Sequence, residues 1–106
     1  MDPRERYDAL CDDLVARNED VELGQMMGMP CVKRSGKMVA GFTRAEGAMA
    51  FKLPDAAVRE QALALDGAHL FDPSGEGRPF KEWVVVPAAH AREWESFAAH
   101  ALRPAG

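Results

Sequence analysis

The amino-acid sequence predicts a single α+β domain in which an antiparallel sheet is covered by helices. Its 106 residues are near the commonest size of one domain, and 47% of them are hydrophobic, which is enough to build a core. Segments with an apolar period of two lie between segments with the period of a helix, and this arrangement is typical of α+β proteins. The predicted order is α-βββ-α-ββ-α, with five strands and with residues 1–106 as one domain.

The N-terminal segment carries a clear helix signal. Asp2 can cap the first amides, Pro3 suits the first helical position, and Glu5 completes a capping box. Apolar residues then recur at helical spacing and form one stripe on a charged helix: Tyr7, Leu10, Cys11, Leu14 and Val15. We expect this helix to end within the stretch Asn18 to Glu22.

The next stretch, Leu23 to Pro30, has no clear period. Gly28 within it predicts a turn or a close approach of the backbone to a neighbour. We interpret its methionines as side chains that fill irregular gaps in the core, and the alternative is an adaptable binding surface. These methionines are Met26, Met27 and Met29.

Three strands with short connections follow. Cys31–Arg34 and Lys37–Thr43 flank the pair Ser35-Gly36 and predict a tight hairpin, and Ala48–Leu53 predicts the third strand. Short connections favour antiparallel pairs, because parallel pairs need long crossovers. Alternate residues are predicted to face the core: Met38, Ala40 and Phe42 in one strand, and Met49, Phe51 and Leu53 in the next. Gly41 either weakens its strand or marks a bulge.

A helix, two strands and a last helix complete the chain. Pro54 begins the helix, and Gly67 follows its end. His69–Phe71 and Lys81–Val86 are the fourth and fifth predicted strands, and Pro87 ends the last strand and can begin the final helix. Residues at helical spacing define the buried sides of the two helices: Val58, Ala62 and Leu65 in the first, and His90, Ala91, Trp94, Phe97, Ala98 and Ala101 in the second.

Several motifs together resemble a known family, the N-terminal domain of the TfoX/Sxy proteins. They are Met26-Met27-Gly28-Met29-Pro30, the hairpin Lys33 to Phe42, Phe51-Lys52-Leu53 and, as the most specific block, Gly77-Arg78-Pro79-Phe80-Lys81-Glu82-Trp83-Val84. The resemblance covers the chain from about Tyr7 to Leu102. It implies a YjbR-like fold and a role connected with the regulation of competence for DNA uptake in bacteria. Longer members add a helical-hairpin domain, whereas this sequence ends at Gly106, so we expect a single-domain member.

Charge is distributed unevenly along the chain. The net charge is −4, with −5 over residues 1–23 and +4 over residues 30–53. In the basic part, Lys33, Arg34 and Lys37 cluster around the turn of the predicted hairpin, where a wing that contacts phosphates would carry them. This cluster predicts an alternative function, the binding of DNA or RNA in transcription or competence. The simpler interpretation is a solvated turn.

The segment Asp72 to Arg78 is rich in glycine, and its amides could surround a phosphate. It leads into a strand instead of a helix, and its two acidic residues would repel an anion. We therefore interpret it as a long hairpin loop, with Arg78 stacked on an aromatic ring or paired with a carboxylate. Together with three residues of the following strand it forms a candidate site for a ligand or an interaction: Arg78, Lys81, Glu82 and Trp83. Both tryptophans, Trp83 and Trp94, are interpreted as core residues, and a sheet-to-helix contact between them is one arrangement.

The sequence contains no recognised pattern of catalytic or metal-binding residues. The three serines lack the setting of an activated nucleophile, and Cys31 at a strand start is interpreted as structural. The three histidines lack the spacing of metal ligands, and the sequence has no Cys-x-x-Cys pair. We therefore expect a protein that is not an enzyme and uses no cofactor or metal, with an unrecognised enzyme as the third hypothesis.

The sequence indicates a cytoplasmic protein, since it has neither a signal peptide nor an apolar run that could cross a bilayer. Cys11 and Cys31 are then expected to be reduced thiols. The function that we predict is that of a regulatory or protein-interaction module with a protein partner. We expect the partner to bind at strand edges or at the methionine turn.

Overall fold

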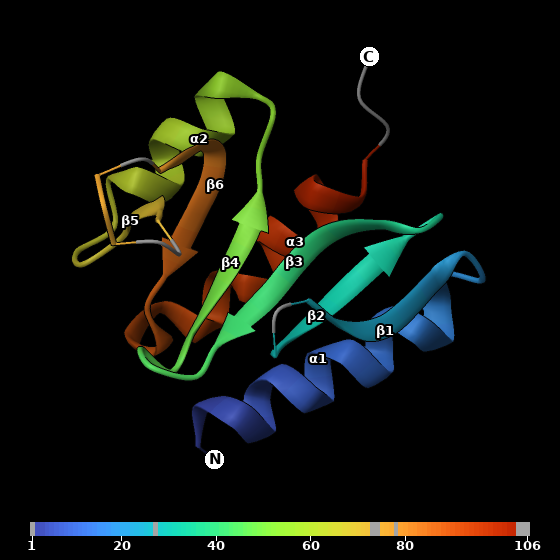
Figure 1. The fold of residues 1–106 in the computed structure, drawn as a ribbon. Helices are drawn as coiled ribbons and strands as arrows, with labels where there is room; N and C mark the ends of the chain where they lie inside the picture. The colour runs from blue at the N-terminus through green and yellow to red at the C-terminus, as the bar shows by residue number, and fades with distance from the viewer. Residues whose placement is uncertain (1, 27, 73–74, 78, 104–106) are drawn as a thin grey trace.

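The structure, a computed structural model, describes residues 2–26, 28–72, 75–77 and 79–103. These residues form an α+β domain with a six-stranded antiparallel sheet whose strand order is β1-β2-β3-β4-β6-β5 (Figure 1). The elements in chain order are α1 (Pro3–Arg17), β1 (Val21–Met26), β2 (Met29–Arg34), β3 (Lys37–Thr43), β4 (Ala48–Lys52), α2 (Ala56–Leu63), β5 (His69–Phe71), β6 (Phe80–Val86), the 3-10 helix η1 (Ala88–Glu93) and α3 (Trp94–Leu102).

The strand β1 is an addition to the five strands that the sequence predicts. It pairs with β2 along its whole length, from Val21 opposite Arg34 to Met26 opposite Met29. It lies at the edge of the sheet, and Val21 is its one fully buried residue. Because most of its side chains reach solvent on both faces, β1 needs no alternation of apolar residues, and its sequence carries no strand pattern.

The predicted helix cap at Asp2 and the predicted hairpin turn at Ser35 and Gly36 have the expected local structure. The capping box of α1 is present: the Asp2 carboxylate accepts a hydrogen bond from the Glu5 amide at 2.8 Å, and the Glu5 carboxylate accepts one from the Asp2 amide at 3.4 Å. The β2–β3 hairpin turns at Ser35 and Gly36, whose φ angles are 51° and 80°. Positive φ at both residues is the geometry that a two-residue hairpin of right-handed twist requires.

The last helix begins later than predicted. The chain after Pro87 forms the short 3-10 helix η1, and His90 within it departs from helical geometry with φ −109° and ψ 25°. The His90 amide donates to the Pro87 carbonyl at 2.9 Å, which is the tighter 3-10 pattern. The α-helix α3 then starts at Trp94, where the chain enters the core.

All three α-helices bury their apolar sides against one face of the sheet, which we call the helix-covered face. Tyr7 of α1 packs against Phe42 of β3 with ring centroids 5.3 Å apart, and Phe51 of β4 packs against Phe97 of α3 at 5.9 Å. The core on this face contains eighteen buried residues: Tyr7, Cys11, Leu14, Val21, Val32, Ala40, Phe42, Met49, Phe51, Leu53, Val58, Ala62, Val84, Val86, Trp94, Phe97, Ala98 and Leu102.

The opposite face of the sheet carries no helix in the described part of the chain, and we call it the open face. A smaller cluster of buried residues on this face contains Ala48, Ala50, Phe71 and Val85, with Met29 and Trp83 packed against them. Trp94 lies on the helix-covered face, where its indole N–H donates to the Val86 carbonyl at 3.1 Å. The sheet therefore separates the two tryptophans, so they do not form the predicted sheet-to-helix contact, and each packs in a different cluster of the core.

A bulge in β3 decides which of its residues face the helices. Val32 is opposite Ala40, but Lys33 is opposite Met38, so Val39 has no partner in β2. Val39 and Ala40 both pack in the core of the helix-covered face, whereas Met38, predicted to lie there, does not belong to it. One extra residue shifts the alternation of a strand by one position.

Candidate functional site

The three basic residues predicted to contact nucleic acid lie in different environments. Arg34 is half-buried: its Nε donates to Asp20 Oδ2 at 2.7 Å, and its Nη1 donates to the Leu102 carbonyl. The hydrogen bond from Arg34 lowers the pKa of the Asp20 carboxyl below its ordinary value. Lys33 is half-buried, and Lys37 is exposed. Arg34 thus ties the hairpin to the end of α3, and Lys37 is the residue most open to a ligand.

The glycine-rich loop joins β5 and β6, which pair antiparallel, so it is a long hairpin loop as predicted. The Asp72 carboxylate accepts hydrogen bonds from the amides of Gly75 at 3.1 Å and Gly77 at 2.9 Å. These amides, which a phosphate would need, are therefore bonded within the loop. Arg78, predicted to belong to a ligand site, lies outside the described residues.

The other three residues of the predicted ligand site line one shallow depression at the surface. Their neighbours include an aromatic cluster, in which the Phe71 ring lies 5.9 Å from Phe80 and 6.3 Å from Trp83. The residues that line the depression are Lys52, Phe80, Lys81, Glu82 and Trp83. Lys81, Glu82 and Trp83 are consecutive in β6, and the structure adds Lys52 of the neighbouring strand β4 to this open surface.

A cavity of about 350 Å³ contains a histidine paired with a carboxylate. The ring nitrogen Nε2 of His69 lies 2.7 Å from Glu46 Oε1, and both side chains are about half exposed. The pair raises the pKa of His69 above its ordinary value of 6.5, because the carboxylate favours the protonated imidazole. The hydroxyl of Thr43 in the same cavity donates to the Ala48 carbonyl at 3.2 Å, so it is bonded to the backbone and not to the imidazole.

The methionine turn divides its side chains between core and solvent. Met29 is half-buried and packs on the open face, where its Cε would lie 2.6 Å from a Cβ placed on Gly41. Met26, on the edge strand β1, is 43% exposed, and Met27 lies outside the described residues. Met29 thus fills a gap in the core, and Met26 is at the surface.

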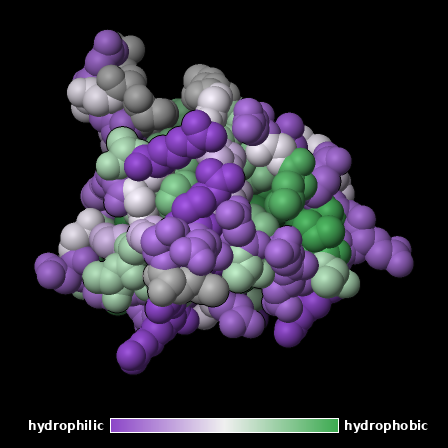
Figure 2. All heavy atoms as spheres, turned by 90° about the horizontal axis from the view of Figure 1, so that it is seen from below, coloured by the Kyte–Doolittle hydropathy of each residue, from purple (hydrophilic) through white to green (hydrophobic). Residues whose placement is uncertain are grey.

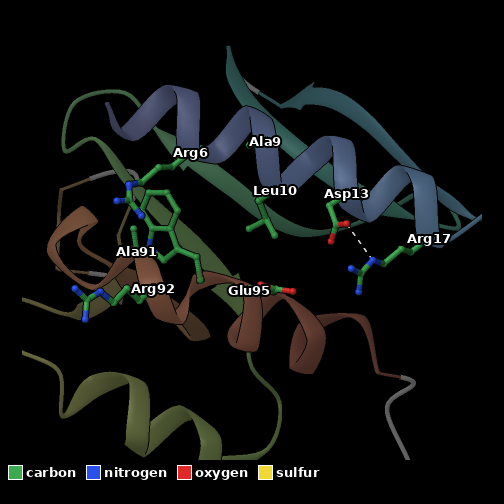
Figure 3. Close-up of a pocket in the computed structure, with 9 residues that line it drawn as sticks. Arg6, Ala9, Leu10, Asp13, Arg17, Ala91, Arg92 and Glu95 are labelled. Atoms are coloured by element: carbon green, nitrogen blue, oxygen red, sulfur yellow. Dashed lines mark ion pairs between the residues drawn. The ribbon is translucent and has the colours of Figure 1, made fainter. Parts of the chain in front are cut away.

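A groove that the sequence does not reveal runs between α1 and the η1–α3 segment (Figure 3). It consists of two adjoining depressions of about 470 and 360 Å³, which share Asp13, Arg17 and Glu95 as lining residues. Leu10 of α1 points into the groove toward the other helix, and Glu95 lies on the opposite side (Figure 3). The groove therefore combines an apolar strip with charged side chains.

Five arginines line this groove, although the chain as a whole is acidic. Arg6 of α1 and Arg92 of η1 lie at one end, and Arg17 lies farther along α1 (Figure 3). The second depression adds Arg34 and Arg103 at the other end. The groove has only two acidic lining residues, Asp13 and Glu95, so its net charge is positive.

The arginines differ in whether the protein itself supplies a counter-charge. Arg17 pairs with Asp13 at 3.0 Å. Within the described part of the chain, the side chains of Arg6, Arg92 and Arg103 are exposed and have no ion pair or hydrogen bond. Unpaired arginines beside apolar surface are available to bind carboxylates of a partner.

Helical spacing is the signal in the sequence that could have located the groove. In α1, Arg6, Leu10, Asp13 and Arg17 lie at i, i+4, i+7 and i+11. Arg92, Glu95, Ala99 and Arg103 have the similar spacing i, i+3, i+7 and i+11, although Arg92 belongs to η1 and Arg103 follows the end of α3. Summing charge by segment hides these arginines, because residues 1–23 have a net charge of −5. That the two helix faces adjoin is visible only in the folded chain.

The face of the domain seen from below is mainly hydrophilic. Figure 2 shows this face, with mostly purple side chains around a compact hydrophobic area. Among the described residues, the large apolar side chains that are exposed are Val15, Leu23, Met26 and Phe80. None of the described helices has the length and apolar character that a bilayer crossing requires.

The described residues contain no group of three or more potential metal-binding side chains. Cys11 and Cys31 are buried and free. Burial raises the pKa of the Cys11 thiol to about 11 and also raises the pKa of Cys31, so both thiols are weak nucleophiles.

Comparisons of the chain with protein-family models, with curated proteins and with solved structures found no match. The chemistry of the groove and of the cavities is therefore the ground for a function.

Proposed function

We propose that this domain is a non-enzymatic regulatory or protein-interaction module that binds a segment of a partner protein in the groove between α1 and α3. The observation that supports this proposal is the groove itself, in which Leu10 lies between ends that carry unpaired arginines. A protein segment can supply both apolar side chains to contact Leu10 and carboxylates to pair with the arginines. Arginine is also a residue type on which binding energy concentrates at interfaces.

The resemblance to the TfoX/Sxy N-terminal domain supports a regulatory role in the bacterial cytoplasm. We propose that the chain is a single-domain member of that family with a YjbR-like topology. The structure has the α+β class that this resemblance implies, with a six-stranded antiparallel sheet in place of the five strands predicted.

Site-specific cross-linking in the native cell tests the interaction function. A photoreactive residue replaces Ala9, which is exposed in the groove, and in a control it replaces Ala57, which is exposed on α2. We expect one discrete cross-linked protein from the groove position and none from the control. The product should disappear when Ala99→Trp fills the second depression, and it should persist with Ala57→Trp. The same set of products from both positions would contradict the proposal.

Nucleic-acid binding by the hairpin is the second candidate, favoured by the exposed Lys37 beside Lys33. Titration with duplex DNA across a salt series tests it. Steep salt dependence that is lost when Lys33, Arg34 and Lys37 are neutralised supports this function. Because Arg34 is bonded to Asp20 and Leu102, the structure favours a shallow dependence at most. Absence of binding at low salt excludes the hairpin as a nucleic-acid site.

A further inference from the structure

We infer that the segment bound in the groove is acidic at both ends, with a short apolar stretch and a basic residue between them. This inference rests on the proposed interaction function and adds the chemistry of the partner. It follows from the placement of charges along the groove, from the length of the groove and from three arginines at its ends, Arg6, Arg92 and Arg103, that have no counter-charge in the described residues.

Each of the two walls of the groove has an arginine at both of its ends. The wall from α1 runs Arg6, Leu10, Asp13 and Arg17, and the wall from η1, α3 and the residue after it runs Arg92, Glu95, Ala99 and Arg103. In each wall an arginine occupies each end, and an acidic or apolar residue lies between. A ligand of matching charge therefore carries carboxylates at its ends.

The charged side chains of the groove that have no partner show where the ligand should place opposite charges. Arg6 and Arg92 at one end, and Arg103 at the other, have no partner in the described residues. Glu95, in the middle, also has none, so a lysine or arginine of the ligand fits there. Asp13 is already paired with Arg17 at 3.0 Å, so the ligand need not supply a basic residue beside it.

The length of the groove sets the spacing of the carboxylates. Arg6 and Arg17, which both lie in α1, are eleven positions apart, and at a helical rise of 1.5 Å per residue the two ends lie about 16 Å apart. An extended chain advances about 3.3 Å per residue. The two acidic groups of an extended segment are therefore about five residues apart.

A peptide fits this order of charge better than a nucleic acid does. A nucleic acid carries a phosphate at every nucleotide, which in each strand of a duplex is one phosphate per about 3.4 Å of helix axis. Along the groove it would place phosphates beside Asp13 and Glu95 as well as beside the arginines. A peptide can confine its carboxylates to the ends, so it avoids this repulsion.

Fluorescence anisotropy with two labelled peptides of one composition tests the inference. The first peptide has eight residues, with two glutamates at each end and leucine, alanine, lysine and leucine between. The second has the same residues with the four glutamates at its centre. We expect the full-length chain to bind the first peptide at least about fivefold more tightly, because charged hydrogen bonds form at both ends.

Charge reversal locates the binding at the groove. The double variant Arg6→Glu with Arg92→Glu should bind the acid-ended peptide about tenfold more weakly, since two attractions become repulsions. It should gain affinity for a peptide whose glutamates at one end are replaced by lysines. The matched control is Lys37→Glu with Arg44→Glu, which reverses two exposed charges outside the groove and should leave binding unchanged. Circular dichroism checks that both variants remain folded.

Three results would overturn the inference. The first is equal affinity for the two peptides, or no binding of either at millimolar concentration. The second is an equal loss of affinity for the acid-ended peptide in the control variant. The third is displacement of the labelled acid-ended peptide by an eight-nucleotide single strand of DNA at a lower concentration than by the unlabelled peptide. None of these results would remove a cross-link formed from position Ala9. The failure of the partner chemistry is therefore distinguishable from the failure of the interaction function.

Discussion

The helix-covered face and the open face of the sheet are built from side chains of different size. On the helix-covered face, large residues such as Phe51 and Met49 are fully buried beneath the helices. On the open face, small residues such as Ala48 and Ala50 are equally buried, but Met29 and Trp83 are what pack over them. Full burial thus has two causes in one sheet. On one face it reflects packing against another layer, and on the other it reflects small side chains beneath larger neighbours.

The comparison also explains where the groove can exist. The helices α1 and α3 use their inner sides for the core, and the groove lies between the two helices, where the core residue Trp94 also lines it. Since Tyr7, Phe97 and Trp94 fix these helices on the sheet, the arginines project from a rigid support. A binding site on rigid helices retains its geometry better than one on a loop.

The largest expected effect comes from removing a phenylalanine from each face in turn. Phe51→Ala should lower the free energy of unfolding by about 3–5 kcal/mol, because it leaves a cavity between sheet and α3 that cannot collapse. Phe71→Ala should cost about 1–3 kcal/mol, since Phe71 is 9% exposed and its neighbour Phe80 can move.

Urea unfolding of the two alanine variants, with a common slope, measures this difference. A loss for Phe71→Ala that equals or exceeds the loss for Phe51→Ala would show that the two faces do not differ in their share of the stability. The expected order follows from the number of sides on which each ring has packed neighbours.

A smaller effect is expected from adding a methyl group on the open face. In Gly41→Ala the new Cβ would lie 2.6 Å from the Met29 Cε and 3.2 Å from the Pro30 carbonyl oxygen, so Met29 must move. We expect a loss of about 1 kcal/mol in the free energy of unfolding. Gly24→Ala is the matched control, because the nearest atom is the end of the flexible Lys33 side chain at 3.2 Å, and its effect should stay within about 0.5 kcal/mol.

The addition of Met29→Ala to Gly41→Ala sharpens this test. If the contact with Met29 causes the loss, the second substitution should cost less in the Gly41→Ala background than in the unchanged protein. Thermal or urea unfolding of the four proteins measures the coupling. Additive losses would mean that Met29 does not constrain Gly41.

The smallest effect concerns the exposed pair of His69 and Glu46 near the edge of the open face. Because the pair raises the pKa of His69, its contribution to stability is complete below the ordinary value of 6.5 and is lost as the pH rises through the raised pKa. For a pair about half exposed this contribution lies within about 0–1 kcal/mol. Glu46→Gln should lower the pKa of His69 in an NMR titration, whereas Glu60→Gln on α2 should leave it unchanged. An equal shift in both variants would assign the effect to net charge.

Local patterns predicted most of the elements but not all. The capping box at Asp2 and the turn at Ser35 and Gly36 depend on neighbours within a few residues, so their sequence patterns are sufficient. The strand β1 has no such pattern, because its pairing with β2 and its exposure on both faces require no alternation. The bulge at Val39 likewise depends on the register of two strands, which local sequence does not encode.

The candidate site was less predictable than the fold. The hairpin around Lys33 and Lys37 was recognisable as basic from the sequence, yet Arg34 there is bonded to Asp20 and to the end of α3. The groove takes its arginines from helices that are nearly a whole chain apart, and no local sum of charge shows them together. A site formed between distant elements exists only when packing brings those elements side by side.

The sequence by itself determined the α+β class, the extent of α1 and the β2–β3 hairpin, because capping, turn geometry and apolar period act over short distances in the chain. Tertiary structure alone decided the edge strand β1, the separation of Trp83 from Trp94 by the sheet, and the groove between α1 and α3. These features depend on which strands pair and on which helix faces meet, and such contacts join residues far apart in the sequence.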